Sequence, residues 1–208
     1  MNHKGIIVVG IGTEIGKTIA SAILVKALKT NYWKPVQSGN LEDSDSLAIK
    51  LLVGAMPGEI FPNTYNFKNP LSPHTAAELE NRKIELSRFK LPHSNKTTIV
   101  ELAGGLMVPL NDRETNLDLI KQLNLPVVLV SKNYLGSINH TILTFELLKR
   151  EQIPCLGIIL NGEPNPSGEK FILNYSGLPV ILRINQEKEL SQEIIHNYAG
   201  KVNQELFN

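Results

Sequence analysis

A glycine-rich loop between an apolar run and a helical pattern constrains this chain more than any other feature of its sequence. The β-branched run 6–9 predicts a buried strand, and residues 18–29 carry apolar side chains at helical spacing. Between them lies the segment GIGTEIGKT, which ends in Gly16-Lys17-Thr18. In such a loop, backbone N–H groups surround phosphate oxygens, the lysine reaches the β- and γ-phosphates, and the hydroxyl ligates Mg²⁺. The segment therefore predicts a phosphate-binding loop.

The loop is a variant of the strict template. That template has a glycine where this chain has Ile11, and here the glycine lies one place earlier, at Gly10. The alternative is a glycine-rich turn that contains Gly-Lys-Thr by chance. A strand directly before the loop and a helix directly after it favour the phosphate loop.

Strand-like and helix-like segments alternate along the rest of the chain. We expect strands at 32–36, 97–102, 126–131, 155–160 and 179–184. We expect helices at 45–53, 74–80, 115–123, 137–150 and 186–206, the last broken at Gly200, and a loop at 63–73. Continuous apolar strands between helices predict an α/β fold: a mostly parallel sheet with helices on both faces, in three layers, as one domain over 1–208. Ligands then bind where the carboxyl ends of the strands meet.

Composition excludes several classes of protein. The 21 Lys and Arg residues nearly balance the 20 Asp and Glu residues, which argues against nucleic acid as a partner. The single cysteine, Cys155, cannot form an intrachain disulfide. The run 6–9 is too short for a signal peptide or a membrane span, so we expect a cytoplasmic protein with no membrane partner. The five histidines show no H-E-x-x-H pattern, so we do not expect zinc.

Several short segments occur in the order and spacing of one known family. GIGTEIGKT resembles the phosphate loop of the dethiobiotin synthetases. The other segments are KPVQSG at 34–39, SDS at 44–46, SPH at 72–74, ELAGG at 101–105 and LGSINH at 135–140, followed by Asn161. The resemblance covers residues 5–162 and implies a P-loop NTPase fold.

This resemblance also implies an activity. Dethiobiotin synthetases use ATP and Mg²⁺ to carboxylate 7,8-diaminopelargonic acid with CO₂ and close the ring, which yields dethiobiotin, ADP and phosphate in biotin biosynthesis. The reaction passes through a carbamate and a carbamic–phosphoric anhydride. Because an anionic carbamate must approach an anionic triphosphate, cations must offset the repulsion. We expect Lys17 to act on the transferring phosphoryl group, Lys34 to hold the carbamate, and Thr13 and Ser38 to donate hydrogen bonds to carbamate or diamine.

The metal and nucleotide ligands are expected from the same motifs. Thr18, Asp45 and Glu101 offer the oxygen ligands that suit Mg²⁺. Taken singly, Lys34 could be a solvated lysine and Asp45 a helix cap, but a carboxylate ending a buried strand, as Glu101 does, needs a partner. The resemblance implies nucleotide contacts at Glu14, Ile15, Gly16, Lys17, Thr18, Ile19, Asp45, Glu101, Gly104, Asn161, Gly162 and Asn185.

Three departures from the family pattern bear on nucleotide binding. Leu102 replaces a glycine, and we expect it to narrow the approach to the phosphates. Gly162 replaces an aspartate beside Asn161. The segment 182–185 reads LRIN where relatives have G-E-I-P. The last two changes affect the expected adenine pocket, so we expect weaker discrimination of ATP from GTP and CTP.

The helix that starts at 137 bears on assembly. Its free N–H groups form an anion site, and in the family the distal carboxylate of the substrate reaches such a helix start across a dimer interface. The resemblance therefore implies a homodimer. We expect His74 and His140 to be structural or interface residues.

Two rival functions remain. The first is a nucleotide-switch ATPase of the partitioning or nitrogenase-iron-protein type. It would carry an extra lysine early in the glycine loop, where this chain has none. The second is a relative that has lost ATP binding, against which the retained Lys17, Thr18, Lys34, Asp45 and Glu101 argue.

Overall fold

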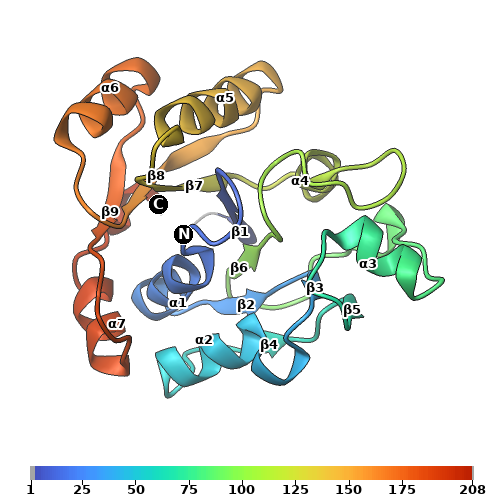
Figure 1. Cartoon of the computed structure of the whole chain (residues 1–208). Helices are drawn as coiled ribbons and strands as arrows, with labels where there is room; N and C mark the ends of the chain where they lie inside the picture. Colours follow the sequence, from blue (N-terminus) through green and yellow to red (C-terminus); the bar gives the residue numbers. More distant parts are fainter. Residues whose placement is uncertain (1–2, 208) are drawn as a thin grey trace.

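The sheet at the centre of the molecule is built from parallel strands (Figure 1). The computed structural model describes residues 3–207, and in them seven strands pair in the order β4-β2-β6-β1-β7-β8-β9, every pair parallel. Their bounds are β1 (Gly5–Gly10), β2 (Asn31–Trp33), β4 (Ile60–Phe61), β6 (Thr98–Glu101), β7 (Val127–Lys132), β8 (Cys155–Asn161) and β9 (Val180–Ile184). The predicted parallel α/β fold is confirmed.

Helices cover both faces of this sheet, as the continuous apolar strands require. Side chains alternate along β1, so that Ile6 and Val8 enter one core and Ile7 and Val9 the other. The first core lies under α1 (Lys17–Leu28), α2 (Asp45–Val53) and α7 (Gln192–Ala199). The second lies under α3 (Pro73–Leu79), α4 (Asn116–Leu123), α5 (Ser137–Arg150) and α6 (Pro166–Ser176). No helix in residues 3–207 has the length and apolar character needed to cross a bilayer.

The strand predicted at 32–36 is divided in the structure. β2 ends at Trp33, and β3 (Val36–Ser38) pairs instead with β5 (Tyr65–Phe67) in a separate two-stranded sheet. Pro35 separates the two because it has no backbone N–H to donate to a ladder. β5 also falls inside 63–73, so the prediction of a loop there is wrong over these residues. Lys34 therefore sits at a break between strands, where its side chain can turn to the sheet edge.

The C-terminal part differs most from the sequence-based expectation. The helix predicted at 186–206 is wrong over 186–191: α7 begins after Ser191, whose side chain accepts from the Ile194 N–H, and a short 3₁₀ turn, η3, covers Gln204–Phe207. A hydroxyl at this position satisfies a free N–H and favours a helix start there. α6 has no counterpart among the predicted elements. Its signal in the sequence is Asn165-Pro166, a capping residue followed by proline at the first helical position.

Candidate functional site

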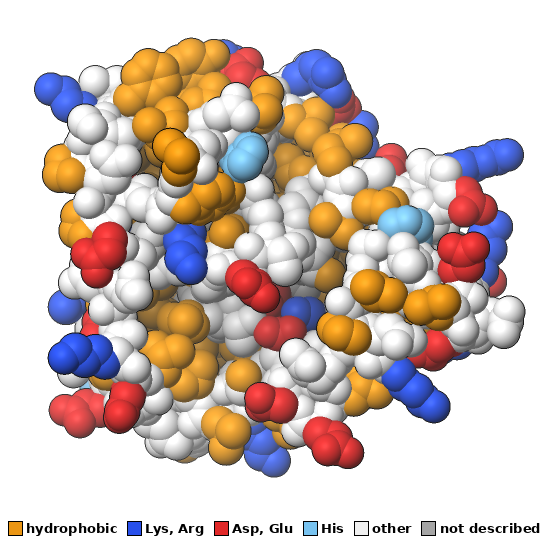
Figure 2. Space-filling view, viewed as in Figure 1, with side chains coloured by type: hydrophobic (Ala, Val, Ile, Leu, Met, Phe, Trp, Pro, Cys, Tyr) orange, Lys and Arg blue, Asp and Glu red, His pale blue; other side chains and the backbone are white. Residues whose placement is uncertain are grey.

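A cavity of about 730 Å³ opens where β1, β2 and β6 end. Its walls include the glycine loop, the β2–β3 junction, the start of α2 and the segment after β6. Most of the predicted site residues line it: Thr13, Glu14, Ile15, Gly16, Lys17, Thr18, Ile19, Lys34, Ser38, Asp45, Glu101 and Gly104. Figure 2 shows acidic and basic side chains beside one another near the centre of the viewed face. Segments far apart in sequence thus bring opposite charges to one place.

The glycine loop is held in shape by β8. Gly16 has φ +87°, and a Cβ there would lie 2.2 Å from Nδ2 of Asn161. That same Nδ2 donates a hydrogen bond of 2.8 Å to the Ile15 carbonyl. Only glycine fits at position 16, because the left-handed backbone and the close asparagine both exclude a side chain. The shape of the loop is therefore supported by contacts within the protein.

Lys17 lies buried inside this loop. Its ammonium donates a hydrogen bond of 2.8 Å to the Gly12 carbonyl. Burial lowers the pKa of Lys17 to about 8; the nearby Lys34 lowers it too, whereas the Glu101 and Asp45 carboxylates raise it. An anion beside the ammonium would favour its charged form, as phosphate oxygens in this loop would do.

A cluster of polar side chains, Thr18, Lys34, Asp45 and Glu101, fills the inner end of the cavity. The Lys34 ammonium pairs with the Asp45 carboxylate and lies 3.5 Å from Glu101 Oε1. Burial alone would lower the pKa of Lys34, but the Glu101 and Asp45 carboxylates raise it above its ordinary value. Burial acts to raise the pKa of Asp45, yet Lys34 holds it below its ordinary value. The cluster therefore keeps Lys34 and Asp45 in their charged forms.

The oxygens of this polar cluster suit Mg²⁺. The Thr18 hydroxyl lies within hydrogen-bonding distance of both Asp45 Oδ1 and Glu101 Oε1, the second at 2.9 Å. One hydroxyl proton cannot serve both carboxylates at once, so three oxygens converge beside the Lys34 ammonium, which pairs with both acids. A small divalent cation with oxygen ligands satisfies such a set. The residues present thus fit the metal that the phosphate loop implies.

Ser38 and Thr13 lie on the walls of the same cavity. The Ser38 hydroxyl is buried and has no hydrogen-bond partner among the described residues. A buried hydroxyl without a partner is costly, and a bound ligand could supply that partner. Thr13 is exposed, so its hydroxyl is open to a bound anion.

Three predicted nucleotide contacts, Asn161, Gly162 and Asn185, lie outside the cavity lining, at the ends of β8 and β9. Gly162 donates its N–H to the Ile184 carbonyl at 3.0 Å. The Asn185 N–H donates to the Tyr198 hydroxyl at 3.0 Å. The structure thus does not bring these residues together with the polar cluster.

Leu102 does not narrow the approach to the phosphates, contrary to our expectation. Its side chain is 1% exposed and packs in the core under α3–α6, while its N–H donates to the Val8 carbonyl. Side chains alternate in an extended segment, so the residue after Glu101 points away from the cavity that Glu101 faces.

The sequence analysis missed two residues that contact the polar cluster. Gln37, within the KPVQSG segment, is buried, lines the cavity and accepts a hydrogen bond of 3.4 Å from the Asp45 N–H. Tyr32 is fully buried, and its hydroxyl donates to Glu101 Oε2 at 2.9 Å. Burial and the Glu101 carboxylate raise the pKa of Tyr32 well above its ordinary value, so the phenol keeps its proton. An aromatic residue in an apolar strand carries no sequence signal for such a contact.

A family model and several similar proteins agree with the motifs. A family model described as an AAA domain matches residues 4–194. A protein of Christiangramia forsetii named "ATP-dependent dethiobiotin synthetase BioD" is 44% identical over 98% of this chain and 98% of its own length. Proteins with the same name from Cytophaga hutchinsonii and Chlamydia pneumoniae are 44% and 42% identical, over 96% and 93% of this chain and 97% and 87% of their own lengths.

Solved structures share the fold at much lower identity. A ParA family ATPase from Chlorobium tepidum superposes with a TM-score of 0.58 at 16% identity, covering 96% of this chain and 100% of its own. The septum site-determining protein MinD from Pyrococcus horikoshii, complexed with Mg-ADP, gives 0.58 at 13% identity, covering 97% and 96%. These structures confirm the P-loop NTPase-like architecture.

Proposed function

Since the chain belongs to the family of ATP-dependent dethiobiotin synthetases, we propose that it carboxylates 7,8-diaminopelargonic acid with CO₂ at the expense of ATP and closes the ring to dethiobiotin. The observation that carries this proposal is the cavity in which Lys17 and Lys34 lie with Thr18, Asp45 and Glu101. Two ammonium groups and a set of cation ligands in one cavity suit a reaction between two anions.

The reaction has three steps. One amine of the substrate attacks the carbon of CO₂ and loses a proton, which gives a carbamate. A carbamate oxygen attacks the γ-phosphorus, and the bond to ADP breaks, which gives the mixed anhydride. The second amine attacks the carbonyl carbon, the phosphate leaves with the bonding pair, and loss of a proton yields the cyclic urea.

Lys34 and Lys17 each stabilise a different negatively charged group in this reaction. Lys34 holds the carbamate, because its ammonium faces the cavity and stays charged between two carboxylates. Lys17 stabilises the charge on the transferring phosphoryl group from within the glycine loop. Thr13 and the unpartnered Ser38 hydroxyl donate hydrogen bonds to carbamate or diamine. Donors placed where charge develops act on the transition state.

Thr18, Asp45 and Glu101 would hold Mg²⁺, which neutralises charge on the phosphate oxygens when bound. The other nucleotide contacts in this proposal come from the loop residues Glu14, Ile15, Gly16 and Ile19, from Gly104, and from Asn161, Gly162 and Asn185 beyond the cavity. Asn161 acts at least through the loop, since its amide holds the Ile15 carbonyl.

The test is the substrate requirement of ATP hydrolysis. We expect phosphate release and dethiobiotin formation in equal amounts, and only when diamine, bicarbonate and MgATP are all present. Phosphate release that needs neither diamine nor bicarbonate would instead identify a nucleotide switch. The absence of nucleotide binding would indicate a relative that has lost it.

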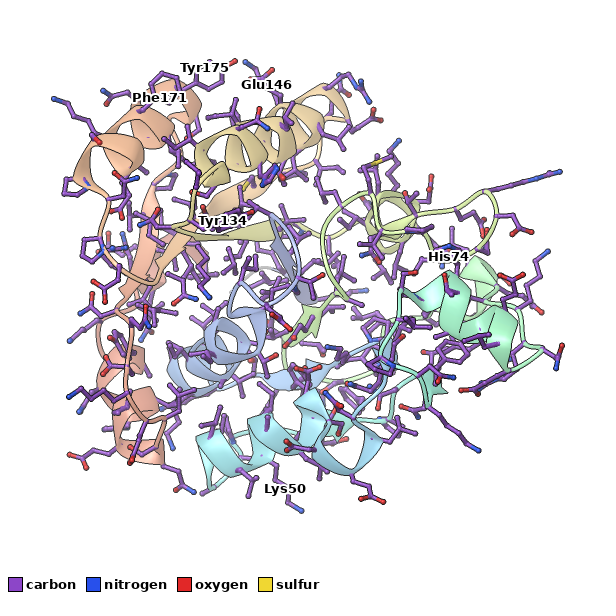
Figure 3. The ribbon with its side chains drawn as sticks, viewed as in Figure 1. Lys50, His74, Tyr134, Glu146, Phe171 and Tyr175 are labelled. Carbon is purple, nitrogen blue, oxygen red and sulfur yellow. The ribbon has the colours of Figure 1, made fainter. Side chains whose placement is uncertain are left out.

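We further propose that the enzyme is a cytoplasmic homodimer that joins through α5 and α6. Large apolar side chains are exposed there: Tyr134, Leu135, Leu143, Phe171 and Tyr175. Tyr134, Leu135 and Phe171 line a hollow of about 810 Å³ beside the start of α5. Figure 3 shows Phe171 and Tyr175 along α6 and Tyr134 near the start of α5. A contiguous apolar surface of this kind marks an interaction site.

The assembly can be tested by sedimentation. Leu143→Glu should convert a dimer into a monomer, because it places a charge in the apolar surface. Leu51→Glu is the control, since Leu51 is 67% exposed, against 60% for Leu143, but lies on α2. A wild-type chain that sediments as a monomer at all concentrations would contradict the proposal.

A further inference from the structure

Glu101 has two carboxylate oxygens with different surroundings. Oε1 faces the cavity, where it lies 2.9 Å from the Thr18 hydroxyl and 3.5 Å from the Lys34 ammonium. Oε2 points the other way and accepts the hydrogen bond from the Tyr32 hydroxyl at 2.9 Å. Glu101 is 1% exposed and Tyr32 is fully buried, so water does not replace this contact.

The sheet register places Tyr32 where it can make this contact. Tyr32 of β2 is the neighbour of Ile99 in β6. Because side chains alternate along a strand, Glu101 projects from the same face of β6 as Ile99. A long aromatic side chain reaches the diagonal neighbour two residues further along the adjacent strand. Tyr32 thereby places its hydroxyl at Glu101, with its ring packed in the core under α1 and α2.

The hydrogen bond from Tyr32 fixes the orientation of the Glu101 carboxylate relative to the cavity. A glutamate carboxylate rotates easily about its last torsion, so either oxygen, or both, could face a cation. With Oε2 engaged by Tyr32, the carboxylate plane is held and one oxygen remains for the cavity. Partners of this type orient metal ligands, and their loss typically weakens metal binding about 10–100-fold.

We propose that Tyr32 is a positioning residue that fixes Glu101 as a one-oxygen ligand for the metal that accompanies the nucleotide. The inference rests on the proposed function only through its MgATP requirement. It adds to that function a residue that contacts neither substrate nor phosphate and acts through Glu101.

Tyr32→Phe tests the proposal, because it removes the hydroxyl and keeps the buried ring. Binding of Mn²⁺ in the presence of ADP is measured by the loss of the free-ion paramagnetic resonance signal. We expect the Mn²⁺ dissociation constant to rise about 10–100-fold. The Mg²⁺ concentration that half-saturates dethiobiotin formation should rise by a similar factor, with the KM for the diamine unchanged.

Tyr65→Phe is the matched control. Tyr65 is also buried, and its hydroxyl accepts a hydrogen bond of 3.0 Å from the Glu85 N–H, away from the cavity. Thermal unfolding should show comparable losses of stability for the two variants, whereas only Tyr32→Phe should alter Mn²⁺ binding. Unchanged Mn²⁺ affinity in a folded Tyr32→Phe protein overturns the proposal, and so does an equal loss of affinity in Tyr65→Phe.

A second pair of variants covers the case in which Tyr32→Phe does not fold. Position 32 is replaced by 4-aminophenylalanine, which keeps a donor, and by 4-methylphenylalanine, which matches its size without one. The amino variant should bind Mn²⁺ tightly and the methyl variant weakly; equal affinities contradict the proposal. Because this readout needs no diamine, it stands even if the chain forms no dethiobiotin, and the two ideas fail separately.

Discussion

Two regions along the carboxyl ends of the strands carry predicted site residues, and the polar groups of the two regions are used differently. At the ends of β2 and β6, side chains face one another across the cavity: Lys34 pairs with Asp45, and Glu101 lies between Lys34 and Thr18. At the ends of β8 and β9, polar side chains bind backbone carbonyls, and Arg183 also pairs with Glu169. Asn161 binds the Ile15 carbonyl and Arg183 binds the Gly162 carbonyl at 3.3 Å.

Side chains of the polar cluster can exchange partners, whereas those at the ends of β8 and β9 hold loops in place. The side chains of the polar cluster are paired with one another, so an incoming anion or cation can replace a partner without unfolding a loop. Asn161 cannot leave Ile15 without leaving a buried carbonyl unpaired, which is costly. We therefore expect the chemical step to depend on the region at the ends of β2 and β6, and nucleotide affinity on the region at the ends of β8 and β9.

The largest expected effect is in the region at the ends of β2 and β6. Lys34→Ala should lower kcat by about 10²–10³-fold or more, because a charged donor to the carbamate is lost. Nucleotide affinity should change little, since the glycine loop is intact. Steady-state kinetics and calorimetry measure the two quantities, with Lys50→Ala, at an exposed position on α2 shown in Figure 3, as the control. A near-normal kcat would remove Lys34 from the mechanism.

A smaller effect, in the region at the ends of β8 and β9, tests what Asn161 does. Asn161→Ala should weaken nucleotide binding about tenfold, the effect of roughly 1.4 kcal/mol for a lost buried hydrogen bond. If Asn161 acts through the loop, ATP, GTP and CTP lose affinity alike; a loss confined to ATP would indicate contact with adenine. Asn111→Ala is the control. The Asn111 amide also donates to a backbone carbonyl, that of the buried residue Ile84, at 2.9 Å and away from the glycine loop.

The smallest effect concerns the base itself. Gly162 and Asn185 are the positions where we expected the family pattern to be broken, and their N–H groups bind Ile184 and Tyr198 within the protein. We expect the wild-type KM values for ATP, GTP and CTP to lie within about tenfold of one another, the span of a single hydrogen bond. A preference for ATP far beyond that span would show that adenine is recognised by other groups.

Local patterns predicted those parts of the fold whose neighbours in the chain suffice to form them. The apolar run of β1, the helix after the glycine loop and the alternation of later strands and helices are read directly from spacing. The pairing of β3 with β5 is not, because it joins short segments separated by α2. The helix predicted from 186 failed since Ser191, not residue 186, supplies the cap.

The site divides in the same way. Lys17 and Thr18 follow from the loop motif, and Lys34, Asp45 and Glu101 from short segments that resemble a family. Tyr32 and Gln37 could not be found from their own positions. Their importance comes from what faces them: Glu101 in the adjacent strand and Asp45 at the start of α2.

By itself the sequence determined the glycine loop, the parallel α/β arrangement and the kinds of side chain available for phosphate, metal and carbamate. Tertiary structure alone decided which of those side chains meet, that Leu102 turns into the core, and that Asn161 holds the loop. The physical reason is the distance along the chain over which each kind of interaction acts. Periodicity and loop chemistry act over a few residues, whereas ion pairs and hydrogen bonds between strand ends depend on the register and crossing of segments distant in the chain.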